Sequence, residues 1–344
     1  MTAHAQAPDP VEAITRSVLY EGYILWPYRR SALKNQRRWT FGGVYPRAYS
    51  VSGHNDDPWL MRTECLIAAE PRAAVELDVS IRFLHIVERR VLRHDPTGDR
   101  FVDSLTVAGV THVSWQEAVE RSFVPPAMRL GDGPAHTPIE IDAGERAEPI
   151  VDADGVVAGT IVRRWQPLSG AIDVSAARIS ERAWKLRVDV SNRSAWAGES
   201  RELTLLRTMA STHARFTVRG GTFVSLTDPP DRFAGLAGAC ENLGTWPVLV
   251  GDPRACDTVL SSPIILPDFP GVAPESRGDF FDGAEIDQLL ALSVLSLTDE
   301  EQRQVRETDP RAREILDRCH GMSAEQFMRL HGLNRERSFT ELKP

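Results

Sequence analysis

The stretch VELDVSIRFLHIV, residues 75–87, decides the fold class of this chain, because apolar and polar side chains alternate along most of it. Successive residues of a β-strand point to opposite faces, so one parity is predicted to face a core and the other to face water. The stretch WKLRVDVSNRS, residues 184–194, repeats this pattern with Trp184, Leu186 and Val188 on the apolar parity. One solvated face and one buried face are typical of antiparallel sheets.

Turn residues separate these strands from further ones. Asp95-Pro96-Thr97-Gly98-Asp99 and Asp152-Ala153-Asp154-Gly155 combine the residue types that favour tight turns, and Gly220-Gly221 does the same later in the chain. Each cluster lies between two strand-like runs, which predicts a hairpin or a strand–turn–strand unit at each place. The predicted pairs are residues 75–87 with 101–107, 149–151 with 156–162, and 216–218 with 223–226.

The period of the apolar residues changes near residue 285. A spacing of three to four recurs among Ile286, Leu289, Leu290, Ser293 and Leu297, which predicts an amphipathic helix. Signals for helix starts follow, because a hydroxyl or carboxylate can accept from the first free backbone N–H groups, and a proline there has no N–H to leave unpaired. These signals are Thr298 with Glu301, Asp309 with Pro310, and Ser323 with Gln326.

We therefore predict a mainly β protein, with sandwich-like antiparallel sheets and a small α-helical C-terminal region. A segment rich in proline and glycine precedes the helical pattern, and this composition indicates an extended strap. The predicted divisions are a disordered N-terminus (1–14), a β-rich body of one or two sub-domains (15–260), the strap (261–284) and the helical region (285–344).

Composition narrows the class of function. The chain has 344 residues, of which 42% are hydrophobic and 26% charged, as in ordinary globular proteins. Its formal net charge of -8 opposes binding to a polyanion, so we predict no nucleic-acid partner. No run of apolar residues approaches the roughly 18 that a membrane helix needs, so we predict no membrane span.

The cysteines and the N-terminal residues bear on location. The 4 cysteines form no C-x-x-C pair, which favours reduced thiols over a disulfide framework. The first residues, MTAHAQAPDP, lack the basic start and the apolar core of a secretion signal. Both observations predict a cytoplasmic protein.

Standard catalytic motifs are absent from the sequence. No nucleophile elbow, phosphate-binding loop or dinucleotide fingerprint is present, so we predict no catalytic residue and no cofactor. Cys319, His320 and His331 are the candidate metal ligands, but their spacing lacks a second ligand pair, so we predict no metal site. The alternative role for His320 is to complement the dipole at a helix end.

Two other histidines allow two interpretations each. His54 lies in Ser52-Gly53-His54-Asn55-Asp56-Asp57, a run that orients a ligand or simply forms a turn. His85 falls on the apolar parity of its strand, where it is either a functional imidazole or a core residue with satisfied hydrogen bonds.

The most distinctive segment is YEGYILWPYRRSALKNQRRWTFGGVYP, residues 20–46, which combines aromatic rings with five cationic side chains. Rings and guanidinium groups are enriched at protein interfaces, so we predict a protein-binding patch here. The alternative is a first strand whose rings pack inward while the following cations are solvated. The predicted partner-binding residues are Trp26, Tyr28, Arg29, Arg30, Arg37, Arg38 and Trp39.

This segment, together with LTDEEQRQVRETDPRAREILDR at residues 297–318, resembles an uncharacterised protein family found with the accessory proteins of actinobacterial-type uptake nickel–iron hydrogenases. The resemblance implies an intracellular role in assembling, maturing or supporting a hydrogenase by holding one of its subunits. It does not imply that this chain binds nickel or iron. Members of the family continue past the helical tail into a small β-barrel-like segment, so the resemblance implies that a peripheral module is missing after Pro344.

The leading hypothesis is a non-catalytic accessory or assembly factor that binds a protein partner, namely a hydrogenase subunit or maturation protein. The alternative is a hydrolase of a sugar or ester that uses acidic residues or His54 in a cleft of the β body. A third hypothesis, metal delivery, requires Cys319, His320 and His331 to converge.

Overall fold

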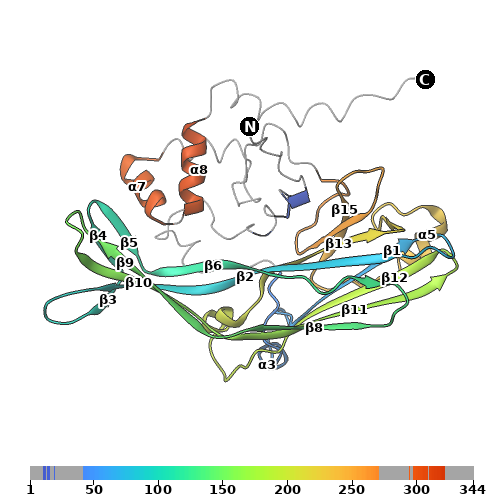
Figure 1. The fold of residues 1–344 in the computed structure, drawn as a ribbon, viewed down its shortest axis with the longest axis horizontal. Helices are drawn as coiled ribbons and strands as arrows, with labels where there is room; N and C mark the ends of the chain where they lie inside the picture. Colours follow the sequence, from blue (N-terminus) through green and yellow to red (C-terminus); the bar gives the residue numbers. More distant parts are fainter. Residues whose placement is uncertain are drawn as a thin grey trace, which may run out of the picture. The chain divides into compact units, whose positions relative to one another are not determined.

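The computed structural model (Figure 1) describes residues 42–270, 297–308 and 310–321, together with Val11, Glu12, Ile14, Thr15, Leu19 and Val294. Its contacts divide the chain into two compact units. The first unit comprises residues 1–19 and 40–271, and the second comprises residues 20–39 and 272–344. The predicted fold class is confirmed, because the described part of the first unit is dominated by antiparallel sheets and that of the second is helical.

Most strands belong to two large sheets. In strand order, the five-stranded sheet contains β14 (Thr222–Val224), β1 (Leu60–Ala68), β12 (Ala183–Asn192), β11 (Leu168–Ser180) and β8 (Ala135–Ile141). The main path of the nine-stranded sheet contains β15 (Trp246–Val250), β16 (Thr258–Ser262), β13 (Ala210–Arg219), β2 (Glu76–Arg93), β10 (Val157–Trp165) and β9 (Gly144–Val151). Its other strands are β3 (Arg100–Val102), β6 (Trp115–Phe123) and β7 (Met128–Arg129).

The remaining elements are short. A two-stranded sheet contains β4 (Ser104–Val107) and β5 (Val110–Val113). Within residues 42–270 of the first unit, the helices are α3 (Arg47–Val51), α4 (Arg201–Thr204), the 3-10 turn η1 (Leu205–Arg207) and α5 (Asp231–Ala237). Within residues 297–321 of the second unit, they are α7 (Asp299–Thr308) and α8 (Pro310–His320).

Strand β2 is the spine of the nine-stranded sheet. On one edge it pairs first with β13, through residues 76–84, and then with β10, through residues 88–93. Its residues 81–89 pair with β6, and because these overlap both of the other partners, β6 must lie on the opposite edge. By the same argument, β7 and β3 lie on the same edge of β2 as β6 does. Strand β2 therefore pairs with five other strands.

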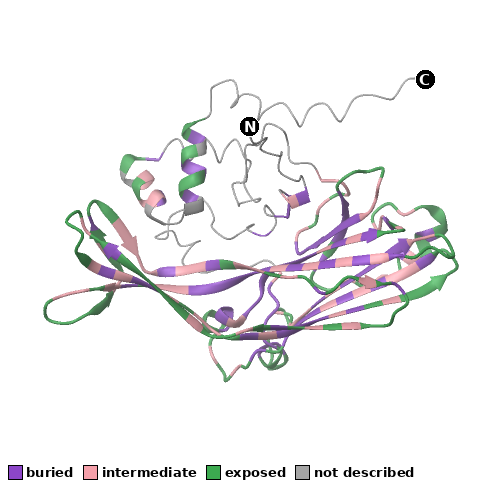
Figure 2. Cartoon of the chain, in the orientation of Figure 1, coloured by how far each residue is buried: buried purple, intermediate pink, exposed green. Residues whose placement is uncertain are grey.

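The main core lies between the two large sheets. The predicted parities are confirmed, because the core takes alternate residues from both strands that decided the fold class. Figure 2 shows the buried residues along these strands. The core positions on β2 and β12 are Leu77, Val79, Ile81, Phe83, Leu186, Val188 and Val190.

Two predicted hairpins are confirmed, one with a change. β9 and β10 pair as predicted, and β3 pairs with β2 after the predicted turn. However, residues 101–107 do not form one strand, because they are divided between β3 and β4. The reason is that β6 already occupies the edge of β2 up to Arg89, so only the last residues of β2 are free to pair with β3.

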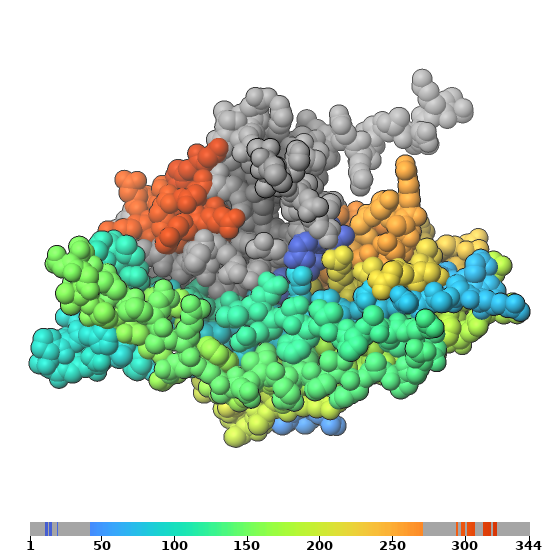
Figure 3. Space-filling model, viewed as in Figure 1, coloured from blue at the N-terminus to red at the C-terminus, as the bar shows by residue number. Residues whose placement is uncertain are grey.

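The hairpins built from β3, β4–β5 and β9–β10 gather at one end of the first unit (Figures 1 and 3). They surround a second, smaller core that β2 supplies through Val91. The other buried members of this core are Val107, Ile150 and Ile161.

The predicted unit of residues 216–218 and 223–226 crosses between sheets. β13 belongs to the nine-stranded sheet, whereas β14 pairs with β1 in the other. The connection contains Gly220, whose φ is 79°. A Cβ atom there would lie 2.2 Å from the carbonyl oxygen of Ala74, so only glycine fits this position.

Buried hydrogen bonds add to the apolar contacts. The hydroxyl of Ser261 lies 2.7 Å from that of Thr63 and 2.7 Å from that of Thr245, which links β16 to β1 between the sheets. The Asn192 side chain is fully buried, and its Nδ2 donates to the carbonyl oxygens of Val44 and Arg207 at 2.8 Å each. These groups would be costly to bury without partners.

Two smaller clusters cover outer faces of the sheets. Val11 and Ile14, which lie within the segment predicted to be disordered, are buried against β15 and β16. Phe233 of α5 packs over Leu66 of β1. In the described part of the predicted strap, Asp268 Oδ1 accepts from the backbone N–H of Leu249 at 2.8 Å. Residues 1–10, 13 and 271–284 of the predicted N-terminus and strap lie outside the described residues.

In the second unit, the predicted capping box is confirmed. The Thr298 N–H donates to Glu301 Oε2 at 2.9 Å, and the Glu301 N–H donates to Thr298 Oγ1 at 3.3 Å. Helix α8 begins at Pro310, as the Asp309-Pro310 signal predicts. The predicted signal at Ser323, and all of the predicted helix from residue 286 except Val294 and Leu297, lie outside the described residues.

Candidate functional site

The outer face of the five-stranded sheet carries a row of four polar residues. Strand pairing places His136 opposite Asp173, Asp173 opposite Asp189, and Asp189 opposite Arg62. Because their neighbours in sequence face the core, these four side chains share the outer face. We call His136, Asp173, Asp189 and Arg62 the polar rung.

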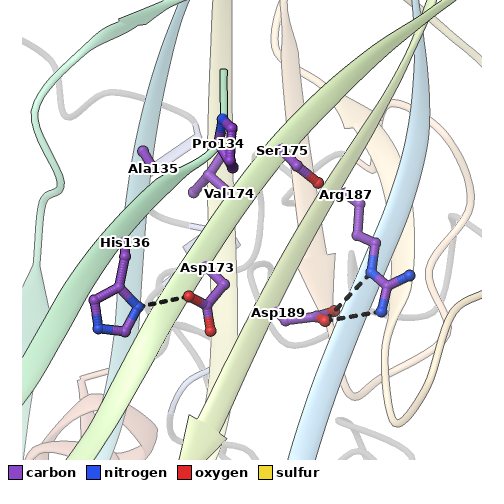
Figure 4. Close-up of a pocket in the computed structure, with 8 residues that line it drawn as sticks. All are labelled: Pro134, Ala135, His136, Asp173, Val174, Ser175, Arg187 and Asp189. Atoms are coloured by element: carbon purple, nitrogen blue, oxygen red, sulfur yellow. Dashed lines mark hydrogen bonds and ion pairs between the residues drawn. The ribbon is translucent and has the colours of Figure 1, made fainter. Parts of the chain in front are cut away.

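Ion pairs join the members of the rung. The Arg62 guanidinium group donates two hydrogen bonds to the Asp189 carboxylate, from Nε to Oδ1 at 2.9 Å and from Nη2 to Oδ2 at 3.1 Å. Arg187, two residues before Asp189 on the same strand, donates through Nη2 to Asp189 Oδ2 at 3.1 Å. His136 Nδ1 lies 2.6 Å from Asp173 Oδ1 (Figure 4). Each carboxylate therefore has at least one basic partner.

An open hollow of about 330 Å³ lies over this face. The side chains of His136 and Asp173 are 55% and 45% exposed, whereas that of Asp189 is only 17% exposed. A solute in the hollow would therefore meet a mixed row of charges, with Asp189 at its base. The hollow is lined by Pro134, Ala135, His136, Asp173, Val174, Ser175, Arg187 and Asp189 (Figure 4).

The electrostatics of the rung determine what it can do chemically. Partial burial raises the pKa of Asp189, but hydrogen bonds from Arg62 and Arg187 outweigh it, so the pKa lies below its ordinary value. Asp189 is therefore ionised at neutral pH. A general acid needs a carboxyl group whose pKa is raised towards neutrality, so Asp189 is unsuited to that role. The rung suits the binding of polar groups.

A second polar group adjoins the rung on β1. Glu64 is almost fully buried, with a side chain 4% exposed, and Lys185 Nζ lies 3.0 Å from its Oε2. The backbone N–H of Glu241 donates to the same oxygen at 2.9 Å. Glu64 thus has the charge partner and hydrogen bonds that a buried carboxylate requires, and it holds the loop before β15 against β1.

The structure places His54 away from this hollow. Its ring stacks on that of Tyr49 with centroids 4.0 Å apart, and its Nδ1 lies 3.1 Å from the Tyr49 carbonyl oxygen. Asp57, from the same loop, receives both Arg201 Nε at 2.8 Å and the Tyr49 hydroxyl at 3.0 Å. The turn interpretation of residues 52–57 is therefore favoured, since these contacts close the loop after α3.

The candidate metal ligands are only partly described. Cys319 is buried, whereas His320 is exposed and its Nδ1 lies 2.9 Å from the Leu316 carbonyl oxygen in the last turn of α8. His331 lies outside the described residues. Within the described part of the chain, no three His, Cys, Asp or Glu side chains gather as metal ligands would. His320 occupies the helix-end position that its alternative interpretation predicts.

The predicted partner-binding residues, Trp26, Tyr28, Arg29, Arg30, Arg37, Arg38 and Trp39, all lie outside the described residues. The polar rung, in contrast, was missed by the sequence analysis. The alternation of residues 184–190 places Arg187 and Asp189 on the polar parity, and this was the available signal. Which residues of other strands lie beside them depends on register, which no local pattern encodes.

Comparisons of the chain with protein-family models, with curated proteins and with solved structures find no match. Among the residues that the structure describes, no helix has both the length and the apolar character needed to cross a membrane.

Proposed function

We propose that this chain is a non-catalytic accessory factor that binds another protein, and that its partner is a subunit or a maturation protein of a nickel–iron hydrogenase. The partner class rests on the resemblance of residues 20–46 and 297–318 to a family found with hydrogenase accessory proteins. The proposal includes a cytoplasmic location. All four cysteines are free, which supports a reducing compartment.

The observation that carries the binding role is the polar rung. Its two carboxylates are held by bases, which supports recognition of polar groups over proton transfer. The ion pairs within the rung already restrain its side chains, so binding of a partner would cost little further side-chain entropy on this surface. The hydrolase alternative needs a carboxyl group that is protonated near neutral pH, and Asp189 does not provide one.

Affinity capture of the tagged full chain from its native cells, under anaerobic conditions, tests the proposal. Co-purified chains are identified by mass spectrometry, and metals are measured in the same eluate. We expect a hydrogenase subunit or maturation protein to be enriched. Recovery of the chain without any such protein would contradict the proposed partner class.

The captured partner then allows the predicted contact residues to be tested by titration. Truncation of a central aromatic or arginine residue costs about 2 kcal/mol or more, or roughly 30-fold in affinity. We expect losses of this size for Trp26→Ala, Arg30→Ala and Trp39→Ala. Trp246→Ala and Arg100→Ala are matched controls, because Trp246 is 45% exposed on β15 and Arg100 is 64% exposed on β3. Equal affinities in all five variants would rule out the predicted patch.

A further inference from the structure

Strand β9 is the last strand of the nine-stranded sheet, and its outer edge has no partner strand among the described residues. All 8 of its residues pair with β10 along the inner edge. Residues 145–149 are exposed without interruption, so neither face of the strand is covered there. The outer edge of β9 therefore presents backbone N–H and C=O groups with which a strand of another chain can pair.

The other end strands of the two large sheets are less suited to pairing. The backbone N–H of Phe269 donates to the Leu249 carbonyl oxygen at 2.7 Å, so the edge of β15 is already covered. β14 has only 3 residues, and Pro138 interrupts the middle of β8. A proline removes a backbone donor from a ladder. In β9 the proline, Pro149, lies nearer one end, and residues 144–148 keep their N–H groups.

A row of arginines ends at this edge. Arg146 of β9 lies opposite Arg163 of β10, which lies opposite Arg89 of β2. Glu117 accepts from Arg89 at 3.2 Å and from Arg163 at 2.7 Å, and Glu148 accepts from Arg163 at 2.8 Å. Among the described residues, Arg146 is the member of the row with no carboxylate within ion-pair distance. Because like charges opposite one another in a sheet are unfavourable, a carboxylate beside Arg146 would be stabilising.

A second copy of β9 supplies that carboxylate. When two β9 strands pair antiparallel with Ala147 opposite Ala147, Arg146 of each copy lies opposite Glu148 of the other. Both side chains stay on the face that they share with Arg163. Glu148 is 53% exposed, so it has room for a second arginine. A shift of two residues in either direction places Arg146 opposite Arg146 or Glu148 opposite Glu148, so charge disfavours the neighbouring registers.

The opposite face of the strand adds apolar contact. Val151 and Val157 lie opposite each other where β9 meets β10, and each is 46% exposed. In the register centred on Ala147, Val151 lies beside residue 143 of the second copy, which is also an alanine. Pairing would therefore remove part of an exposed apolar surface from water.

We propose that β9 is the interface of a symmetric dimer of this chain, in which Arg146 of each copy pairs with Glu148 of the other and Ala147 lies at the twofold axis. The contact is isologous and joins two nine-stranded sheets into one continuous sheet. It uses a different surface from the polar rung, so it holds whether or not the chain binds a protein partner.

Sedimentation velocity of the full chain tests whether the dimer forms. One strand pair is a small interface, so we expect a reversible monomer–dimer equilibrium with a Kd of about 10 micromolar. A chain that stays monomeric up to about 100 micromolar would overturn the proposal.

Charge reversal locates the interface. Arg146→Glu sets carboxylates opposite each other, and Glu148→Arg sets cations opposite each other, so each variant alone should associate at least about tenfold more weakly. An equimolar mixture of the two variants should regain association, because every charge in the contact then meets its opposite. A misfolded variant would not recover in this way. Undiminished association of the single variants, or a mixture that associates no better than they do, would overturn the proposal.

Arg100→Glu is the matched control for charge reversal. Arg100 is 64% exposed on β3, which β2 and β10 separate from β9. Its reversal should leave the Kd unchanged. A loss of association as large as that of Arg146→Glu would show that the overall charge, and not the β9 contact, governs association.

A cysteine at the twofold axis tests the register. Opposite residues of an antiparallel pair have Cβ atoms about 5 Å apart, so Ala147→Cys should form a disulfide-linked dimer with oxidised glutathione. Ala143→Cys is the control, because its two copies would be about 26 Å apart in this register. The natural chain controls for its own 4 cysteines. Equal cross-linking at residues 143 and 147 would exclude the proposed register.

Discussion

Individual buried side chains make the stability of this protein depend on pH. His213 of β13 is 1% exposed, and its Nδ1 lies 3.1 Å from the Ser211 carbonyl oxygen, while its Nε2 has no hydrogen-bond partner among the described residues. Burial lowers the pKa of His213 from 6.5 to about 4. The folded protein therefore holds this imidazole neutral at pH values where the unfolded chain protonates it.

We predict that the free energy of unfolding falls between pH 6.5 and pH 4. The contribution of neutral His213 is fully present above its unfolded pKa of 6.5 and is lost as the pH falls through its folded pKa of about 4. The loss is about 2 kcal/mol at pH 5. Urea unfolding at pH 7.5 and pH 5 measures it, and His213→Asn should remove about 2 kcal/mol of the difference. A difference that is unchanged in His213→Asn would contradict the assignment.

At the scale of single elements, the β4–β5 hairpin contains a backbone strain that one substitution can relieve. Ala108 and Gly109 form its two-residue loop, and their φ angles are 49° and 78°. Positive φ at both positions defines the type I′ turn, in which asparagine or aspartate followed by glycine is preferred. Alanine is disfavoured in the left-handed region because its Cβ crowds the following carbonyl oxygen.

We predict that Ala108→Asn stabilises the protein by about 0.5 to 1 kcal/mol, because asparagine tolerates the left-handed region better than alanine. Gly109→Ala is the opposite control. A Cβ at Gly109 would meet nothing within 4 Å, so its cost of about 1 kcal/mol would come from the backbone alone. Thermal unfolding of both variants shows whether each substitution raises or lowers the melting temperature. A lower melting temperature for Ala108→Asn would exclude the type I′ assignment.

The strands also show which structural features a local sequence pattern can predict and which it cannot. Alternation predicted the inward residues of β2 and β12, since the parity of a strand depends only on its own sequence. The division of residues 101–107 into β3 and β4 was not predictable, because it results from β6 occupying the edge of β2. The contact between the buried His85 ring and the Leu206 carbonyl oxygen was equally hidden, since it joins β2 to η1 across 121 positions of the sequence.

At the scale of the whole first unit, β2 should be the most stable element. It is hydrogen-bonded along both edges, and residues 83–87 are all buried. The two-stranded β4–β5 sheet, in contrast, is largely exposed or half-buried. Opening of β2 would break the sheet and uncover both cores, whereas β4–β5 can open locally.

We therefore predict that peptides covering residues 77–87 exchange their amide hydrogens more slowly than peptides covering residues 104–113, by about 100-fold or more. Hydrogen–deuterium exchange with mass spectrometry measures both in one sample. Peptides of β9, which pairs along one edge with β10, provide an intermediate reference. Similar rates for β2 and β4–β5 would show that the first unit opens as a whole.

The sequence by itself determined the mainly β class, the inward parities of the long strands and the capped start of α7, because each depends on residues a few positions apart. Only the tertiary structure decided which polar residues meet. Arg62 and Asp189 are 127 positions apart, and His136 and Asp173 are 37 apart. The register that aligns them is set by packing of the apolar faces between two sheets, and no local pattern carries that information.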